Sequence, residues 1–558
     1  MITNKDPLRF AILVEWGLTN IIGSYIMISI DKLSKLYAAG RISRRDFMQG
    51  ATAMGVTIAA ASTMAVQAEA STPKTGGTLR SGIGHGSTTD SFDPATFENG
   101  FANALCFASG NHLTEINNEG QLIPELAESY SSDDGITWRF KIRQGVEFHN
   151  GKTLTPEDVI ASLNHHRGEE STSGAKGLLS ALQEMSVDGD SVVFVLEAAN
   201  ADWPFIMSDY HFKILPSKDG VAYFDGGVGT GGYKVENFEP GVKLESSRFP
   251  NYWKEDAAYF DGLVFTSVID QVARQNALMN GEVDAIDRVN AQTVDLLASV
   301  PHINIVENTG TLHYTFGMRL NVEPFGNYDL RMALKSAIKR QELVDKILNG
   351  HGALGNDHPI SSANQYPNTD LPQREFDADK AAHHYKKSGH SGPIKIAAAN
   401  AAFAGAVDAA QLIAASCAEA GISVEVDKVP DDGYWSNVWN NDAHGWSACY
   451  WGGRPTEDWM FSAAYISGSD WNDTSWRGTA SSKEFNSLVV AARAELDVAK
   501  RKEMYFRCQA LIHDDGGATI PMFANYINGL NKSIGHKDKM GANWDMDGGK
   551  ASERWWFN

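Results

Sequence analysis

The stretch Ala448–Phe461, ACYWGGRPTEDWMF, decides how the rest of this sequence is interpreted. It opens with a short apolar run typical of a buried strand, and two glycines, an arginine and a proline follow directly. Glycine lets backbone approach a ligand closely, aromatic rings form pocket walls, and charged groups orient a polar molecule. The stretch therefore fits the mouth of a ligand pocket, but it fits an ordinary turn rich in tryptophan equally well.

The length and composition indicate a globular protein of more than one domain. A chain of 558 residues is too long for one compact core, so we expect two or three domains. The net charge of −21 argues against nucleic acid or an anionic membrane as a partner. Fourteen tryptophans and seventeen tyrosines are many for a core alone, and flat aromatic faces suit the binding of peptides, sugars or other small polar molecules.

The N-terminal segment carries the pattern of an export signal. A basic region at Ser43–Gln49 (SRRDFMQ) precedes an uncharged run, Gly50–Val66, and small residues around Ala68 and Ala70. This order predicts a signal peptide, and the paired arginines followed by phenylalanine resemble a twin-arginine signal. We expect export to the periplasm by the twin-arginine machinery and cleavage after Ala68 or Ala70, so that residues 1–70 are an N-terminal extension plus a cleaved signal peptide.

Residues 1–26 fit poorly ahead of this signal. Met27 would begin a signal peptide of ordinary length, so we interpret the upstream stretch as the product of an overcalled start codon; the alternative is an apolar anchor over Phe10–Ile30. Export places the cysteines in an oxidising compartment, where three full pairings are possible. Twin-arginine cargo folds before export, so reduced, buried cysteines are equally consistent with the sequence. The four are Cys106, Cys417, Cys449 and Cys508.

The pattern of predicted helices and strands changes near residue 310. Before it, Thr137–Ile142 alternates apolar and polar residues as a strand does, Val192–Leu196 is a second strand, and Thr155 is placed to cap a helix between them. Beyond it, helices alternate with short strands, which indicates an α/β lobe with a partly parallel sheet. Ligands in such lobes bind beyond the carboxyl ends of strands, where the Ala448 stretch falls. The predicted helices are 328–348, 407–420, 485–496 and 501–512, and the predicted strands are 394–396 and 422–426.

Six segments, in the same order along the chain, resemble those of one protein family. They are Gly76–Leu79, Leu122–Tyr130, Gly145–Ser162 (GVEFHNGKTLTPEDVIAS), Val228–Trp253, Asp329–Leu334 and Trp451–Tyr465. Together they resemble the family 5 extracellular solute-binding proteins, the periplasmic dipeptide and oligopeptide receptors of ABC importers. Each segment alone is modest, but six in order are specific.

The resemblance implies an α/β, two-lobed periplasmic-binding-protein fold of type II, cluster C, with an extra β-rich subdomain in the first lobe. It implies a first lobe at 71–309, a second lobe at 310–515 and a return to the first lobe at 516–558. The implied function is capture of a peptide or peptide-like solute by hinge closure and its delivery to the permease subunits of an ABC importer. It implies no enzyme activity, no catalytic residue, no cofactor and no metal, and we expect a monomer. The alternatives are a binder of a non-peptide anionic small molecule on the same fold, a secreted hydrolase and a chaperone-like peptide holder.

One departure from the family pattern concerns the ligand. Many peptide-binding members have an aspartate, which holds the α-ammonium group of the peptide, where this chain has Arg454. An arginine repels an ammonium group but binds a carboxylate or phosphate in bidentate fashion. Either Glu457 or Asp458 takes over the amine, or the ligand is an anion other than a free-amine peptide; a third possibility is that Arg454 packs on an aromatic ring and turns to solvent. The candidate ligand-binding residues are Tyr450, Trp451, Gly452, Gly453, Arg454, Glu457, Asp458, Trp435 and Trp439, although the last two fit core packing as well.

Two further patterns look like sites and are interpreted as ordinary structure. Asn543–Gly548 begins like a calcium loop, but Arg554 stands at the twelfth position instead of glutamate, which favours a tight acidic turn. The pairs His165-His166 and His383-His384 lack a carboxylate at ligand spacing, so we interpret them as solvated histidines.

Overall fold

The structure, a computed structural model, describes residues 30, 32–33, 42–54, 56–57, 73–97, 99–430, 434–452, 454–469 and 471–558, without the side chains of residues 435 and 436. The chain divides into two compact units, residues 1–73 with Asn558 and residues 74–557. In the first unit, α3 (Arg44–Ala53) begins at the paired arginines, and Ser43 and Asp46 cap it reciprocally. Residues 1–26 and the predicted cleavage positions lie outside the described residues. None of the helices in the described part is long and apolar enough to cross a membrane.

The second unit is built on one mixed sheet. Eleven strands of the described chain form it, with β14 and β19 antiparallel at its centre, β1 parallel to β12 and β13, and β16 parallel to β17 and β18. In order across the sheet they are β10 (Tyr233–Glu239), β11 (Lys243–Arg248), β12 (Gly262–Ser267), β1 (Thr78–Ile83), β13 (Ala285–Ile286), β19 (Ala518–Asn531), β14 (Ile303–Met318), β18 (Trp446–Trp451), β16 (Ile394–Ala398) and β17 (Val424–Lys428), with β15 (Gly352–Leu354) paired to β19.

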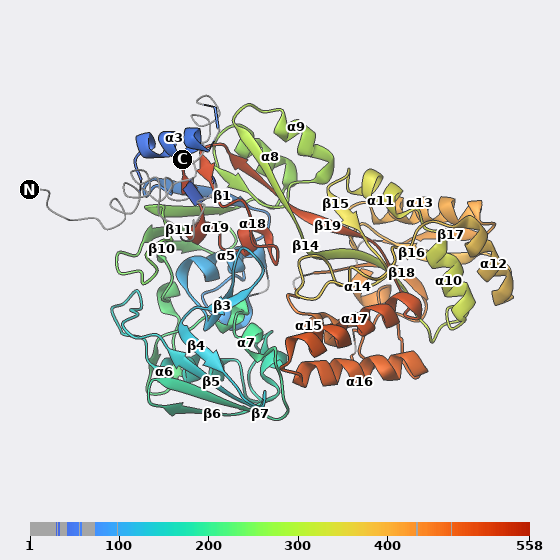
Figure 1. Ribbon diagram of the computed structural model, residues 1–558, viewed down its shortest axis with the longest axis horizontal. Coiled ribbons are helices and arrows are strands. Elements are labelled where there is room, and N and C mark those ends of the chain that lie inside the picture. The colour runs from blue at the N-terminus through green and yellow to red at the C-terminus, as the bar shows by residue number, and fades with distance from the viewer. Residues whose placement is uncertain are drawn as a thin grey trace, which may run out of the picture. The chain divides into compact units, whose positions relative to one another are not determined.

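The long strands β14 and β19 run between two parts of this unit (Figure 1), and each part has its own group of hydrophobic cores. Residues 79–306 and 527–557 pack around one group, which we call the first lobe. Residues 312–524 pack around the other, which we call the second lobe. Because Ala518–Ala524 at the start of β19 packs in the second-lobe cores, we propose that the chain returns to the first lobe within β19 and not at residue 516.

The first lobe contains the predicted β-rich subdomain, a four-stranded antiparallel sheet in the order β4 (Ala127–Ser131), β5 (Thr137–Ile142), β7 (Ser191–Leu196), β6 (Leu182–Asp188). Both predicted strands and the helix after Thr155, α6 (Pro156–His165), are confirmed. The small strand pairs are β2 (Thr114–Ile116) with β3 (Leu122–Pro124), β8 (Ser217–Lys218) with β9 (Val221–Ala222), and β20 (Ile534–Gly535) with β21 (Trp556–Phe557). The other helices are α5 (Gly100–Ser109), α7 (Trp203–Ile206), α8 (Gln271–Met279), α9 (Val294–Ala298), α18 (Asp545–Gly548) and α19 (Ala551–Arg554), with short 3-10 turns η1 (Pro94–Thr96), η2 (Lys176–Leu179), η3 (Tyr210–Phe212), η4 (Asp225–Gly227) and η5 (Ala291–Thr293).

The second lobe has the predicted alternation of helices and parallel strands, with one correction. The single helix predicted over 328–348 is wrong, because α10 (Tyr328–Ser336) and α11 (Arg340–Ile347) are separate. The carbonyl of Ser336 accepts a hydrogen bond from Asp377 N at 2.9 Å, and that of Lys335 accepts one from Arg340 Nη2 at 3.2 Å, so these acceptors leave the helical ladder. The remaining helices are α12 (Ala378–Ser388), α13 (Ala406–Glu419), α14 (Tyr434–Asn437), α15 (Glu457–Ala464), α16 (Ala480–Ala494) and α17 (Val498–Asp514).

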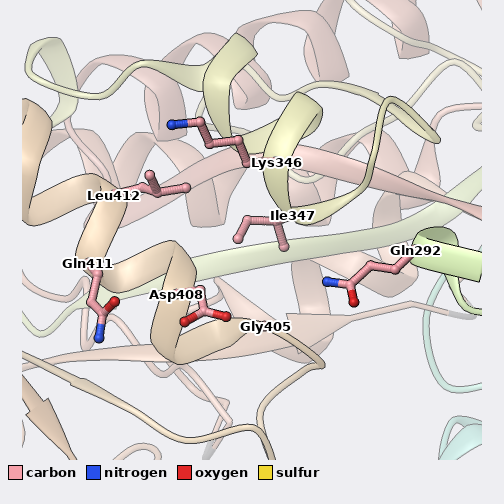
Figure 2. Close-up of a pocket in the computed structure, with 7 residues that line it drawn as sticks. All are labelled: Gln292, Lys346, Ile347, Gly405, Asp408, Gln411 and Leu412. Atoms are coloured by element: carbon pink, nitrogen blue, oxygen red, sulfur yellow. The ribbon is translucent and has the colours of Figure 1, made fainter.

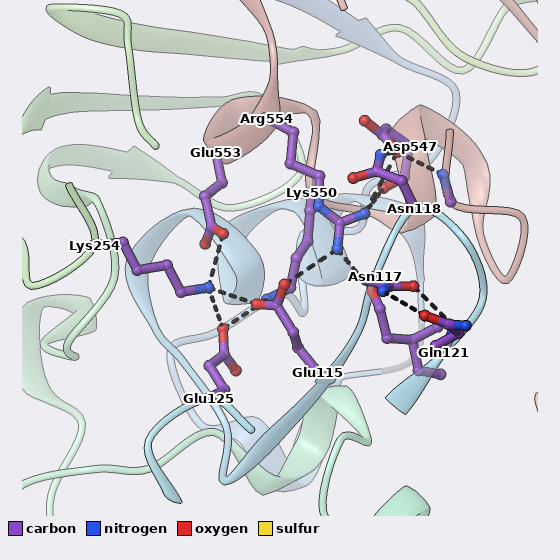
Figure 3. Close-up of polar contacts among 12 residues, drawn as sticks. Glu115, Asn117, Asn118, Gln121, Glu125, Lys254, Asp547, Lys550, Glu553 and Arg554 are labelled. Atoms are coloured by element: carbon purple, nitrogen blue, oxygen red, sulfur yellow. Dashed lines mark hydrogen bonds and ion pairs between the residues drawn. The ribbon is translucent and has the colours of Figure 1, made fainter. Parts of the chain in front are cut away.

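A buried ion cluster joins the C-terminal segment to the rest of the first lobe (Figure 3). Lys254 Nζ lies 2.8 Å from Glu125 and 2.8 Å from Glu553, and Lys550 Nζ lies 2.6 Å from Glu115 and 2.7 Å from Glu125. The three carboxylates lie close enough together to hold a metal ion, but the two ammonium groups occupy the space between them. The cluster therefore fixes the end of the chain through charge pairing.

The acidic turn is confirmed, whereas one histidine interpretation is wrong. Asp547 Oδ1 accepts hydrogen bonds from Gly541 N at 2.6 Å and from Asn118 at 2.8 Å, as a carboxylate that organises a turn does. His166 is fully buried and not solvated, since its Nδ1 lies 2.7 Å from Ser173 Oγ and its ring packs 5.2 Å from that of Phe212. The four cysteines are buried and unpaired in this structure.

Candidate functional site

Strand β18 carries the first half of the Ala448–Phe461 stretch into the sheet between the lobes. It pairs antiparallel with β14, so that Tyr450 lies opposite Tyr314 and Trp451 opposite His313. Alternation along the strand leaves the Tyr450 side chain 47% exposed and buries Trp451 in a second-lobe core. The tyrosine is thereby presented to solvent from a rigid element, with the turn that contains Arg454 directly after it.

The two described tryptophans among the candidates surround a buried carboxylate. Trp439 Nε1 donates to Asp473 Oδ2 at 3.2 Å, Trp451 Nε1 donates to the same oxygen at 3.3 Å, and the two rings lie edge to face 6.1 Å apart. Burial raises the pKa of Asp473. Helix α14 ends at Asn437, so Trp439 lies in the turn that follows and not on the same helix as Trp435. The pair supports the floor of the site from inside the lobe.

Arg454 is a partly buried cation with no ion pair to any carboxylate in the described part of the chain. Its Nη1 donates to Gly452 O at 2.6 Å, and its guanidinium lies 5.2 Å from the centre of the Trp451 ring. Burial lowers the pKa of Arg454, and the groups that oppose this effect are chiefly tyrosine hydroxyls and not acids. The guanidinium is thus held in place by a carbonyl and an aromatic face, without a counter-charge.

Glu457 and Asp458 find partners away from the Arg454 guanidinium. Helix α15 begins after Thr456, whose hydroxyl accepts a hydrogen bond from Trp459 N. Glu457 is buried and accepts a hydrogen bond from Tyr366 N at 2.7 Å, and Asp458 pairs with Arg493 of α16 at 3.0 Å. Burial raises the pKa of Glu457 to about 7. Both acids therefore take part in packing α15 against its neighbours.

Residues of the first lobe and of β19 complete the surroundings of Arg454. The hydroxyls of Tyr210 and Tyr526 lie near enough to act on its charge, and Tyr210 packs edge to face on Trp544 at 5.7 Å. Burial raises the pKa of Tyr526, and the charges of both Arg288 and Arg454 oppose that effect, so two arginines from different lobes act on one hydroxyl.

An acid lies at the same place. Asp545 pairs loosely with Arg288 at 3.5 Å, its side chain is 19% exposed, and burial raises its pKa to about 7. Arg288, Met546 and Asp547 adopt positive φ angles of 51°, 54° and 61°. Residues with a Cβ rarely adopt such positive φ angles, and backbone strain of this kind concentrates at functional sites. The arrangement offers a cation, an acid and several hydroxyls to one small polar molecule.

One family of known proteins matches most of this chain. The family model of the bacterial extracellular solute-binding proteins, family 5 (middle region), matches residues 121–473. The chain belongs to this family. It is a solute-binding protein and not an enzyme.

Named relatives of this solute-binding protein support the same fold. It is 23% identical to the dipeptide-binding protein of Escherichia coli K12 over 495 residues, which covers 80% of this chain and 89% of that one. The substrate-binding protein CtaP of Listeria monocytogenes superposes with a TM-score of 0.75 at 20% identity and covers 87% of this chain and 100% of its own. AgaA of A. tumefaciens R10 in complex with agropinic acid superposes with a TM-score of 0.68 at 22% identity, covering 86% of this chain and 99% of its own. The predicted cluster C fold is confirmed.

The sequence located one side of this solute-binding protein's candidate site and missed the other. The structure brings Tyr450, Gly452 and Arg454 together, with Trp451 beneath them. Gly453 and the Trp435 side chain lie outside the described residues. The residues that sequence reasoning missed come from the first lobe and β19, and only the acidic turn at 543–548 gave any local signal; they are Tyr210, Arg288, Tyr526, Trp544 and Asp545.

A pocket lies elsewhere, between η5 of the first lobe and α11 and α13 of the second (Figure 2). It encloses about 280 Å³ and contains none of the candidate ligand-binding residues. Among the described residues that line it, Lys346 and Asp408 are the only charged ones, and none of them contributes an unpaired buried polar atom. The pocket is lined by Gln292, Lys346, Ile347, Gly405, Asp408, Gln411 and Leu412.

Proposed function

We propose that this protein captures a peptide or peptide-like solute with an anionic group between its lobes and delivers it to the permease subunits of an ABC importer. The observation that carries the proposal is the Arg454 guanidinium, which is partly buried on an aromatic face without an acid partner in the described chain. Withdrawing a charge from water without a counter-ion costs free energy, and a bidentate carboxylate of a ligand offsets that cost. The name of the Escherichia coli dipeptide-binding protein supports a peptide-like ligand.

The amine of such a ligand needs an acid, and we assign it to Asp545. Glu457 and Asp458, the acids expected from the sequence, already have partners in Tyr366 and Arg493. Asp545 is partly exposed and shares the neighbourhood of Tyr526 with Arg454. A zwitterion then lies with its anionic group on Arg454 and its ammonium on Asp545, while Tyr450 forms a wall.

A second candidate is a non-peptide anion, as the AgaA complex with agropinic acid illustrates. It is favoured by the two arginines, Arg288 and Arg454, that act on the same tyrosine hydroxyl from different lobes. In this case both cations bind the anionic groups, and Asp545 orients Arg288.

Export by the twin-arginine machinery and a periplasmic location belong to the same proposal. The paired arginines stand at the start of α3 in the N-terminal unit, and the unit that holds the candidate site begins at residue 74. A protein that hands a solute to an importer works outside the cytoplasmic membrane, and we expect it to act there as a monomer.

The test is to identify what the protein binds and whether Arg454 holds it. Small molecules released by denaturing the purified protein are identified by mass spectrometry, and their affinities, together with that of L-alanyl-L-alanine, are measured by calorimetry. Arg454→Ala should weaken binding of an anionic ligand by roughly 10- to 100-fold, because a charged hydrogen-bonded pair contributes about 1.5–3 kcal/mol. Arg139→Ala, which removes an exposed arginine of the subdomain sheet, is the matched control. An unchanged affinity for Arg454→Ala, or a released ligand without any anionic group, overturns the proposal.

A further inference from the structure

The lobes of this protein meet at a second place, far from β14 and β19. Helix α7, at the edge of the first-lobe subdomain, lies beside α16 and α17 of the second lobe (Figure 1). Two polar contacts join them. Asp202 Oδ1 lies 2.6 Å from Arg501 Nη2, and Ala201 N donates to Arg493 O at 2.7 Å.

The ion pair between Asp202 and Arg501 is shielded from water. The two side chains are only 5% and 7% exposed, although their residues are 299 positions apart and belong to different lobes. The two charged side chains are buried only while the lobes are in contact, because separation of α7 from α17 would expose both side chains to solvent. The pair therefore reports, and depends on, the contact between the lobes.

Each half of the contact is held in place by its own lobe. On the first-lobe side, Asn200 Oδ1 accepts a hydrogen bond from Asp202 N at 2.9 Å, and Trp138 Nε1 donates to Asn200 O at 3.1 Å. On the second-lobe side, Arg501 Nε donates to Ala492 O at 3.0 Å, and its guanidinium lies 5.4 Å from the Tyr505 ring. Little side-chain order is lost when the halves meet, because both are already oriented.

We propose that Asp202 and Arg501 form a latch that lets the two lobes stay closed, in the protein alone as well as with ligand; this rests on the proposed function. The latch acts by permitting closure more than by driving it. Burying two opposite charges against each other costs about as much free energy as their attraction returns. The intact pair therefore changes the balance between open and closed lobes little, and the bound ligand sets that balance. Removing one partner leaves the other to be buried alone, which penalises the closed arrangement selectively.

The roles of Glu457 and Asp458 follow from this geometry. Asp458 pairs with Arg493, the residue whose carbonyl accepts the hydrogen bond from Ala201. The negative charge of Asp202 helps to raise the pKa of both Glu457 and Asp458. The acids that follow the Arg454 turn therefore connect the ligand-binding stretch to the latch through α15.

The experiment measures the separation of the lobes directly. Fluorophores are attached through genetically encoded reactive residues at Asp188 and Val490, which are exposed on β6 and α16, and energy transfer gives the ratio of open to closed molecules. The ratio is measured for the protein alone and with L-alanyl-L-alanine. Asp202→Asn should raise the open-to-closed ratio at least tenfold, and the apparent affinity for any bound dipeptide should fall by the same factor.

Two further variants keep the result decisive. Glu484→Gln removes a carboxylate that pairs with Arg507 of the same α17 but within one lobe, and it should leave the ratio unchanged. Arg501→Lys keeps the charge and serves if Asp202→Asn fails to fold, and it should raise the ratio by a smaller factor. An unchanged ratio in both latch variants overturns the latch. Failure of the dipeptide to bind tells against the peptide ligand alone, because the ratio in the protein without dipeptide still tests the latch.

Discussion

Replacing Glu457 by glutamine should change how the stability of the protein depends on pH. Burial raises the pKa of this carboxyl from 4.5 to about 7, despite the hydrogen bond that it accepts from Tyr366 N. Below pH 4.5 the folded and unfolded states both keep the proton. Between 4.5 and 7 the unfolded chain releases a proton that the folded protein retains, so rising pH favours unfolding by about 1.4 kcal/mol per pH unit. The stability therefore falls with rising pH, whereas a salt-bridged acid makes the stability rise with pH.

Glutamine cannot titrate, so Glu457→Gln should gain stability relative to wild type as the pH rises. The gain is near zero at about pH 4 and about 3 kcal/mol at about pH 8. For a unit of roughly 480 residues, an unfolding entropy of about 2 cal/mol/K per residue converts this gain into about 3 °C of Tm. Any pH-independent cost of the amide shifts both ends of the series equally and does not affect the slope.

Thermal unfolding of the two proteins across this pH range is the assay. Histidines that are buried without charge, such as His166 and His313, titrate in both proteins, and their contribution cancels in the difference. Glu425→Gln, at an exposed position on β17, is the control and should follow wild type throughout. A Tm difference for Glu457→Gln that stays constant from about pH 4 to about pH 8 would show that the native carboxyl is not held protonated, and the reasoning from burial would fail.

Two other predictions concern stability and chemistry. Glu553→Gln should lower the free energy of unfolding by about 3 kcal/mol near neutral pH, because it leaves the buried Lys254 ammonium short of a carboxylate; the effect should fade as the pH falls toward about 2, the pKa of Glu553, and thermal unfolding at several pH values checks both statements. The four buried cysteines should not react with a thiol reagent in the native protein, and all four should react once it is denatured; rapid labelling of the native protein would contradict their burial.

The sequence predicted those features that depend on residues close together along the chain. The alternation in Thr137–Ile142, the cap at Thr155 and the acidic turn around Asp547 were all confirmed, since periodicity, capping and turn formation act over a few residues. The helix predicted across residues 336–340 failed for the opposite reason. Its apolar spacing continues, but Asp377 N and the Arg340 side chain take the carbonyls that the helix would have used.

The sequence alone indicated the family, the alternation of helices and strands in the second lobe, and the place of Arg454 shortly after a strand. The identity of the groups that surround that arginine, and of the acids that already have partners, became visible with the folded chain. Tyr210, Arg288 and Asp545 reach the site from distant parts of the chain, and Asp202 meets Arg501 across 299 residues. The strength of an interaction between two charges depends on their distance and on their shielding from water. Neither quantity can be read from the spacing of residues along the chain.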